Sequence, residues 1–412
     1  MCGIFGYIGS KDNAGEIVFN GLKKLEYRGY DSWGVAFKNL DGKLLSIKHT
    51  GKIQDLKQVF VKAKIALGHT RWATHGGVTK ANAHPHLSCD NKLAIVHNGV
   101  MENYQEIKKS LKLKHLFRSE TDTEVYVHYL EEELIKENNL VKAVRKTFKS
   151  LNGLNSIIIL DINNNQLIAV KNGSPLVLTT NQEGSYIASD TASLLEYSKK
   201  VKFLKDMEMV VLSDDGITLI DVLSGKELIP QYEEIKWTAE DANIGKYEHF
   251  MLKEIEEQPK ILFNLANNSK KDIQNLAGEI KNLHLCFIAC GSAYYASLEA
   301  VYFFNKLLKI APQTTIASEY TLYKNINLKK TVLLALSQSG ETIDLIEAVN
   351  MYRKKGIKVV SLINNMGSTL SRISDKSFLL NAGPEMAVAA TKSFTTMIAY
   401  LYVLVYTILG NM

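Results

Sequence analysis

Hydrophobic and polar positions follow different periods in the two halves of the chain. In the first half most apolar runs are short and alternate with polar residues, which predicts strands. Two stretches, residues 14–25 and 121–137, have the period of an amphipathic helix. Asn, Gly and Asp lie between the strands, so we expect mixed β structure with inserted helices and no parallel sheet. The predicted strands are residues 2–8, 34–37, 44–49, 65–69, 93–97, 156–161, 166–171, 176–180, 186–189 and 209–212.

After residue 250 short apolar strands alternate with helices, which predicts a doubly wound parallel sheet. Between the halves the apolar residues lose their regular spacing, and a polar stretch with two turn signals follows. We therefore expect a first domain at 1–222, a linker at 223–250 and a second domain at 251–412. The second domain's predicted elements are helices 251–267, 273–282, 293–308 and 342–355 and strands 285–289, 314–317, 331–336 and 358–363.

Composition narrows the class of protein. A chain of 412 residues with 46% hydrophobic and 22% charged residues is typical of a soluble protein with at least two domains. The net charge of +6 is spread along the chain, so we expect no nucleic-acid partner. Four cysteines and no signal peptide predict a cytoplasmic protein without a disulfide framework. The apolar run 397–409 is shorter than the roughly 20 residues of a membrane span, so we expect a core or interface helix and no membrane partner.

Cys2 is the first candidate for chemistry, because removal of Met1 would leave a thiol and a free α-amine on one residue. A thiol needs a base to act as a nucleophile, and an α-amine with a pKa of about 7.7–8.0 can supply it. The sequence start therefore predicts an N-terminal nucleophile. The alternative is a buried thiol without a role in catalysis.

Three polar clusters of the first half, residues 71–76, 97–99 and 119–124, could complete such a site. The Asn98 amide and the Gly99 N–H are suitable donors for an oxyanion. Arg71 could bind a carboxylate bidentately and Asp122 an ammonium, which are the two charged groups of free glutamine. Alternatively, residues 97–99 form an ordinary turn, and the two charged residues lie on the surface.

Ser337-Gln338-Ser339-Gly340-Glu341-Thr342 follows a predicted strand and precedes a helix, so it offers hydroxyl and N–H donors for an anion. Cys290-Gly291-Ser292 ends a neighbouring strand and would face the same crevice. The alternative is a helix cap. His69, His75, His84, His86 and His97 lie near one another in the sequence without the spacing of a metal site, and we expect no metal and no cofactor.

These motifs together resemble the glutamine–fructose-6-phosphate aminotransferase (isomerising) family, the glucosamine-6-phosphate synthases. The segments M-C-G-I-F-G-Y, Y-R-G-Y-D-S, R-W-A-T-H-G, H-N-G and S-E-T-D-T-E occur in the order of the family, and the resemblance extends over essentially the whole chain. It implies an N-terminal αββα Ntn-hydrolase domain, a class II glutamine amidotransferase, followed by one doubly wound αβα SIS (sugar isomerase) domain. It also implies amino-sugar synthesis from glutamine and fructose 6-phosphate or a related hexose phosphate, in a homodimer.

The resemblance also assigns roles to residues of this chain. It implies Cys2 as nucleophile, Asn98 and Gly99 as oxyanion hole, and Trp72 as the side chain that gates ammonia. The implied glutamine-binding residues are Arg71, Thr74, His75, Gly76 and Asp122. The residues expected to bind the sugar phosphate are Ser292, Ser337, Gln338, Ser339 and Thr342.

The chain also departs from the family pattern. The family has a second SIS domain and a tail that supply a Schiff-base lysine, a catalytic glutamate and a histidine, and none of these maps onto this sequence. Three single residues also differ from the family pattern. Trp33, which we expect beside the glutaminase centre, replaces an alanine, and Ala293 and Ala390 each replace a serine. Two functions therefore stay open: the complete synthase reaction, or a glutaminase and phosphosugar-binding protein without synthase activity of its own. The second predicts that the apolar helix 396–409 has lost its covering domain and dimerises or aggregates.

Overall fold

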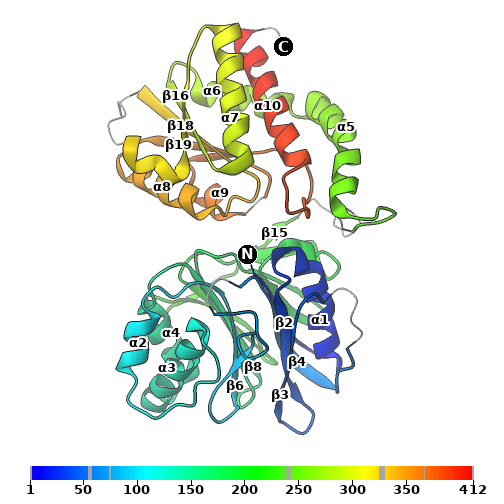
Figure 1. Cartoon of the computed structure of the whole chain (residues 1–412), viewed down its shortest axis with the longest axis vertical. Helices are drawn as coiled ribbons and strands as arrows, with labels where there is room; N and C mark the ends of the chain where they lie inside the picture. Colours follow the sequence, from blue (N-terminus) through cyan, green and yellow to red (C-terminus); the bar gives the residue numbers. More distant parts are fainter. Residues whose placement is uncertain are drawn as a thin grey trace. The chain divides into compact units, whose positions relative to one another are not determined.

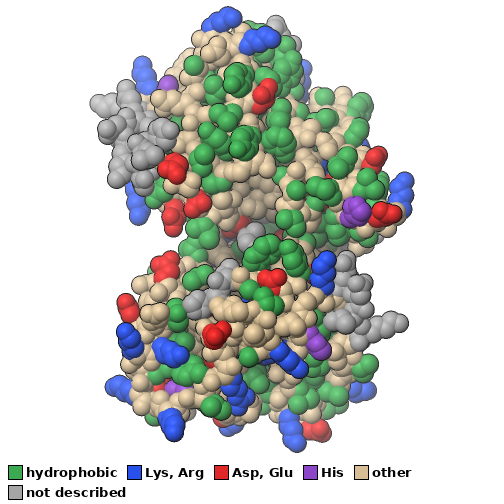
Figure 2. All heavy atoms as spheres, in the orientation of Figure 1, with side chains coloured by type: hydrophobic (Ala, Val, Ile, Leu, Met, Phe, Trp, Pro, Cys, Tyr) green, Lys and Arg blue, Asp and Glu red, His purple; other side chains and the backbone are tan. Residues whose placement is uncertain are grey.

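The computed structural model describes residues 2–53, 58–73, 76–235, 238, 241, 243–323, 330–365 and 367–410. The chain divides into two compact units, Met1–Thr238 (unit 1) and Ala239–Met412 (unit 2), shown in Figure 1. The division falls within the predicted linker, whose short strands Glu227–Leu228 and Glu233–Glu234 pair with the sheets of unit 1. On the face shown in Figure 2, acidic and basic side chains are scattered over each unit among neutral and hydrophobic ones.

Unit 1 contains two stacked antiparallel sheets. In spatial order, the first sheet is β15 (Glu233–Glu234), β11 (Lys200–Phe203), β9 (Val177–Asn181), β10 (Gly184–Ala188), β1 (Gly3–Gly9), β4 (Ala63–Arg71), β2 (Ser32–Asn39) and β3 (Leu44–Thr50). The second sheet is β14 (Glu227–Leu228), β13 (Gly216–Asp221), β12 (Glu208–Ser213), β8 (Gln166–Asn172), β7 (Asn155–Asp161), β6 (Leu93–Gly99) and β5 (His86–Leu87).

The alternating pattern of the strands buries one face of each sheet against the other. Ile4 and Leu67 of the first sheet share a core with Val96 and Ile158 of the second. Helix α1 (Ala14–Leu25) covers the outer face of the first sheet, over β1 and β4. Helices α2 (Tyr104–Ser110), α3 (Asp122–Glu137) and α4 (Leu140–Lys149) cover the outer face of the second, so the predicted αββα fold is confirmed (Figure 1).

Unit 2 is a three-layer αβα domain, as predicted, around the parallel sheet β17 (Gln313–Ile316), β16 (His284–Ala289), β18 (Thr331–Ser337), β19 (Lys358–Ile363) and β20 (Lys376–Leu379). One face carries α5 (Phe250–Asn268), α6 (Lys270–Ile280), α7 (Gly291–Phe303), the π-helical turn Phe304–Leu308 and α10 (Lys392–Leu409). The other carries the 3₁₀ segment Ala317–Tyr323, α8 (Ile343–Lys354) and α9 (Thr369–Ile373). After β16 the chain first adds β17 on one side and then β18 on the other, so the strand order reverses at this pair.

Helix α10 is long and apolar enough to span a membrane by length and composition alone, but it is a core helix of unit 2. Met397, Tyr400, Leu401 and Leu404 are buried in the cluster that also contains α6, α7 and the sheet. Unit 2 therefore covers one side of this helix, and the expected dimerisation or aggregation through it stays a prediction. Tyr402, Ile408 and Leu409 of α10 are exposed, and Ile398 and Val403 are half-buried.

Trp33 lies opposite Thr70, the residue before Arg71, in the pairing of β2 with β4. It lies on β2 and is 1% exposed. Its ring stacks on His49 with centroids 4.8 Å apart, and it meets the Phe19 ring of α1 in a T-shaped contact with centroids 5.2 Å apart. The large side chain therefore fills space between α1 and the first sheet.

Candidate functional site

Cys2 directly precedes β1 at the centre of the first sheet, and its neighbours hold both its thiol and its carbonyl group. The Trp72 N–H donates to Cys2 Sγ over 3.2 Å. Arg28 Nε and Asn98 Nδ2 donate to the Cys2 carbonyl oxygen over 3.3 and 3.0 Å. Burial raises the pKa of the Cys2 thiol, although the Trp72 N–H and the Arg71 charge partly oppose this effect. The thiol therefore needs a base to become a thiolate at neutral pH.

Asn98 at the end of β6 is oriented by a buried histidine. His69 Nε2 lies 3.1 Å from Asn98 Oδ1 and 3.0 Å from the His97 carbonyl oxygen, and both of these atoms are acceptors. Burial lowers the pKa of His69 to about 3, so the ring is neutral and its proton is on Nε2. This N–H fixes the Asn98 oxygen on one side, which turns the Asn98 NH₂ group toward Cys2.

Gly99 follows Asn98 and has a φ of +127°. A Cβ atom at this position would lie 2.0 Å from the Leu154 carbonyl oxygen, so only glycine fits here. The two predicted oxyanion donors are thus adjacent on β6, and the amide of Asn98 already contacts the main chain of Cys2.

Of the charged residues predicted to bind glutamine, Arg71 lies near the thiol and Asp122 lies near Arg71. Arg71 ends β4 and Asp122 begins α3. Burial lowers the pKa of Arg71, and the negative charges of Cys2, Asp31 and Asp122 act in the opposite direction, which places these groups around the guanidinium. Asp122 Oδ2 accepts the Met101 N–H over 2.8 Å, and this bond holds its carboxylate in position.

Arg71 also shapes the loop that follows it. Its Nη1 and Nη2 donate to the carbonyl oxygens of Gly77 and Gly76 over 3.0 and 3.2 Å. Asn82 Nδ2 donates to the Gly77 carbonyl and to Glu120 Oε2, so the loop is tied to the start of α3. The predicted residues Thr74 and His75 lie outside the described residues.

Trp72, the predicted ammonia gate, is on the surface of unit 1. Its side chain is 38% exposed, and its ring lies against Tyr30 with centroids 5.3 Å apart. Asp31 Oδ2 accepts the N–H of Ala73, the residue that follows Trp72, over 2.8 Å. A Cβ atom on Gly29 would lie 2.7–2.8 Å from the backbone at residues 71–72, so this segment needs a glycine beside it. The role of Trp72 as a gate for ammonia stays a prediction.

Two residues that support this site were not predicted to do so. His69 appeared in the sequence only as a weak metal candidate, although it lies two residues before Arg71. Asp190 accepts from Arg28 Nη1 over 2.8 Å and from the Tyr27 hydroxyl over 2.7 Å, which holds Arg28 next to Cys2. Asp190 is distant from Cys2 in the sequence and has no motif around it.

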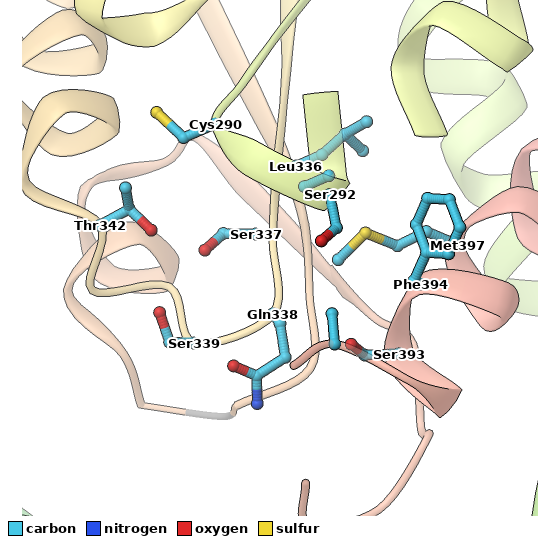
Figure 3. A pocket seen from close by; sticks show the side chains of 12 residues that line it. Cys290, Ser292, Leu336, Ser337, Gln338, Ser339, Thr342, Ser393, Phe394 and Met397 are labelled. Atoms are coloured by element: carbon cyan, nitrogen blue, oxygen red, sulfur yellow. The ribbon is translucent and has the colours of Figure 1, made fainter. Parts of the chain in front are cut away.

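Unit 2 has a cavity of about 160 Å³ that is lined by all five residues predicted to bind the sugar phosphate (Figure 3). It lies at the carboxyl ends of β16 and β18, where the strand order reverses. This is the usual ligand position in an open α/β sheet. Its lining is Cys290, Ser292, Ala293, Leu336, Ser337, Gln338, Ser339, Thr342, Ala390, Ser393, Phe394 and Met397.

The donors of this cavity come from a tight loop and from helix starts. The N–H of Gly340 donates to Ser337 Oγ over 2.9 Å, and the N–H of Glu341 donates to Ser339 Oγ over 3.1 Å. Figure 3 shows the hydroxyl groups of Ser337, Ser339 and Thr342 around one common space. Neither Cys290 nor Thr342 caps the helix that it precedes with a side-chain hydrogen bond to a described residue. The first N–H groups of α7 and α8 therefore add positive potential for an anion.

Gly340 and Ser393 show what the sequence did not reveal about this cavity. Gly340 has a φ of +67°, and a Cβ atom there would lie 2.1 Å from Ser368 Oγ. Ser393 at the start of α10 was not among the predicted residues. It donates to the Glu385 carboxylate over 2.5 Å. The departures Ala293 and Ala390 both line the cavity, so they bear directly on what it binds.

Comparisons with known proteins match both units. A glutamine amidotransferase domain family matches residues 36–214, and a SIS domain family matches residues 280–406. The chain is 42% identical to a "Glutamine--fructose-6-phosphate aminotransferase [isomerizing]" of Methanococcus maripaludis, over 98% of this chain and 69% of that protein. It is 38% identical to the protein of the same name from Thermus thermophilus, over 98% of this chain and 68% of that protein. A solved C-terminal domain of glucosamine-fructose-6-phosphate aminotransferase from Francisella tularensis is 31% identical, with a TM-score of 0.38, over 41% of this chain and 51% of that chain.

Proposed function

Because the chain belongs to the glutamine–fructose-6-phosphate aminotransferase (isomerising) family, we propose that unit 1 hydrolyses glutamine at Cys2. We further propose that the ammonia aminates fructose 6-phosphate bound by unit 2, giving glucosamine 6-phosphate. The observation that carries the proposal is the set of contacts at Cys2: a thiol beside an N–H of Trp72 and an Asn98 amide oriented by His69.

In the proposed reaction the α-amine of Cys2, free after removal of residue 1, takes the thiol proton. The thiolate then attacks the side-chain amide carbon of glutamine, and Asn98 Nδ2 and the Gly99 N–H donate to the oxyanion that forms. Collapse of this intermediate breaks the C–N bond, and the protonated amine returns its proton to the leaving ammonia. Water hydrolyses the γ-glutamyl thioester, which releases glutamate and restores the thiol.

The charges near the thiol select the substrate in this proposal. The Arg71 guanidinium pairs with the α-carboxylate of glutamine and the Asp122 carboxylate with its α-ammonium. Both charges are buried in the free protein, with Arg71 3% and Asp122 6% exposed. A substrate that lacks either charged group would lose one of these two ion pairs, so we expect a preference for free glutamine over a glutamine side chain within a peptide.

The cavity of unit 2 is suited to the phosphate group of the sugar. Its hydroxyl groups are neutral donors, and the starts of α7 and α8 supply positive potential without a cationic side chain among the twelve lining residues. We propose that Ser337, Ser339 and Thr342 bind the phosphate and that Ser292 and Gln338 contact the sugar or the phosphate from the walls.

Labelled substrate tests the proposed reaction. We expect the purified chain, given glutamine labelled with ¹⁵N at its side-chain amide and fructose 6-phosphate, to release glutamate and ¹⁵N-labelled glucosamine 6-phosphate, as measured by mass spectrometry. Glutamate with free labelled ammonium and no amino sugar would restrict the activity to glutamine hydrolysis. The absence of both products would contradict the proposal.

The Ser339→Ala variant tests the sugar-phosphate cavity. Loss of one hydroxyl that contacts a charged phosphate costs about 1.5 kcal/mol, so we expect about tenfold weaker binding of fructose 6-phosphate in calorimetry. Ser318→Ala, an exposed serine of the same unit that does not line the cavity, is the matched control. Equal affinity of Ser339→Ala and the unchanged chain would remove this loop from the binding site.

A further inference from the structure

A group of four side chains in unit 1, separate from the residues around Cys2, has the arrangement of a metal site. Cys89 follows β5, His115 lies between α2 and α3, and His128 and Glu131 are on α3. One ligand atom of each residue lies within 4.8 Å of the ligand atoms of the other three. These residues are not the histidines that drew attention in the sequence, because the chain brings them together from three separate segments.

Four of the six distances between the ligand atoms can be compared with the edges of a tetrahedron, and all six are within 4.8 Å. Cys89 Sγ lies 3.7 Å from His115 Nδ1 and 3.6 Å from His128 Nδ1. Glu131 Oε2 lies 3.4 Å from His115 Nδ1 and 2.6 Å from His128 Nδ1. Zinc bonds of 2.0–2.3 Å in a tetrahedron require edges of about 3.3–3.7 Å. Three of these four distances match that range, and the fourth would lengthen by less than an ångström.

Contacts on the far side of the ligands orient them toward this common point. Glu131 Oε1 accepts the N–H of Cys89 over 2.6 Å, which leaves Oε2 for the two imidazoles. His115 Nε2 lies 3.2 Å from Glu132 Oε1, so a carboxylate holds the ring with Nδ1 inward. The N–H groups of Lys112 and Leu113 in turn donate to Glu132 Oε1, each over 2.7 Å. Such a carboxylate–histidine pair is the common second layer of zinc sites.

We propose that Cys89, His115, His128 and Glu131 bind one Zn²⁺ ion with structural function. A thiolate, two imidazoles and a carboxylate in tetrahedral geometry suit zinc better than Mg²⁺ or Ca²⁺, which prefer oxygen ligands. All four positions come from protein, so the ion has no open site for a substrate. It would join the loop after β5 and the segment before α3 to α3 itself.

The proposal has a competing explanation in the same contacts. Without a metal, the pair His128–Glu131 would be a hydrogen-bonded ion pair, with His115 and the Cys89 thiol packed against it. The two explanations differ in stoichiometry and in the role of sulfur. A zinc site binds one ion per chain through a deprotonated thiol, whereas an ion-pair cluster binds none.

Metal analysis of the full chain distinguishes these explanations. The untagged chain is equilibrated with Zn²⁺ and then dialysed against metal-free buffer. We expect it to retain about one zinc per chain, as measured by inductively coupled plasma mass spectrometry. Co²⁺ in place of Zn²⁺ should give a thiolate-to-metal charge-transfer band and the visible spectrum of a tetrahedral site. Both signals should disappear in the Cys89→Ser, His115→Gln double variant. The controls Cys286→Ala and His284→Gln, in unit 2, should keep both.

Glu132→Gln keeps the test informative if the double variant folds poorly. The amide oxygen of glutamine can still accept the N–H groups of Lys112 and Leu113, but it orients His115 less strongly, so we expect about 10–100-fold weaker zinc binding. Zinc retained below about a tenth of an equivalent by the unchanged chain would overturn the proposal. Full retention by the double variant would also overturn it. Neither result depends on glutamine hydrolysis, since the readouts are metal content and a spectrum.

Discussion

Cys2→Ala should abolish the release of glutamate from glutamine, with a fall in kcat of at least about 10⁴-fold. The physical reason is that the variant has no thiol at this position to attack the amide carbon, and Cys89, the other described cysteine of unit 1, belongs to the separate four-residue cluster. Glutamate release measured with a coupled dehydrogenase, on protein whose intact mass shows that residue 1 is absent, gives the result directly.

The control for this variant is Cys286→Ala, which removes a buried thiol from unit 2 and should leave the kcat for glutamine unchanged. The pH profile adds a second check. A free α-amine acts as base only when deprotonated, so kcat/KM should rise with pH toward the amine pKa of about 7.7–8.0. Turnover by Cys2→Ala within tenfold of the unchanged chain would refute the role of Cys2 as nucleophile.

Asn98→Ala should lower kcat for glutamine hydrolysis by about 10²–10³-fold with little change in KM. Asn98 Nδ2 donates to the Cys2 carbonyl oxygen in the free protein, and His69 fixes the orientation of this amide. The donor is therefore in place before the oxyanion forms, and its loss is felt mainly in the transition state. Steady-state kinetics that resolve kcat from KM measure the effect.

Asn98→Asp is the sharper companion variant. Its carboxylate can still accept from His69, yet it offers no donor and adds a negative charge beside the oxyanion, so its kcat should fall at least as far. Asn163→Ala, in an exposed turn, is the matched asparagine control and should be unchanged. A rise in KM without a fall in kcat for Asn98→Ala would assign this residue to substrate binding alone.

The period of apolar residues predicted the helices and strands that have a regular apolar pattern and missed some that do not. β19 was predicted with its observed limits, and α5 differs by one residue at each end, because both elements have long, regular apolar patterns. Helix α4 was not predicted, although its buried positions have a helical period, because polar residues flank this short pattern on both sides.

The site was predictable where short motifs carry it and unpredictable where distant residues support it. Cys2, Arg71 and Asn98 come from three segments, each with a recognisable local pattern, and the structure places them together. The support from His69 and Asp190 depends on strand pairing across the sheet, which no local pattern encodes.

Strand β1 pairs with β4 on one side and with β10 on the other, and Phe5 lies opposite Ala188. During synthesis one edge of β1 therefore stays unpaired until the ribosome has made residues 184–188. At 5–20 residues per second this delay is on the order of ten to forty seconds. In this interval the edge of Phe5–Gly9 that pairs with β10 is open.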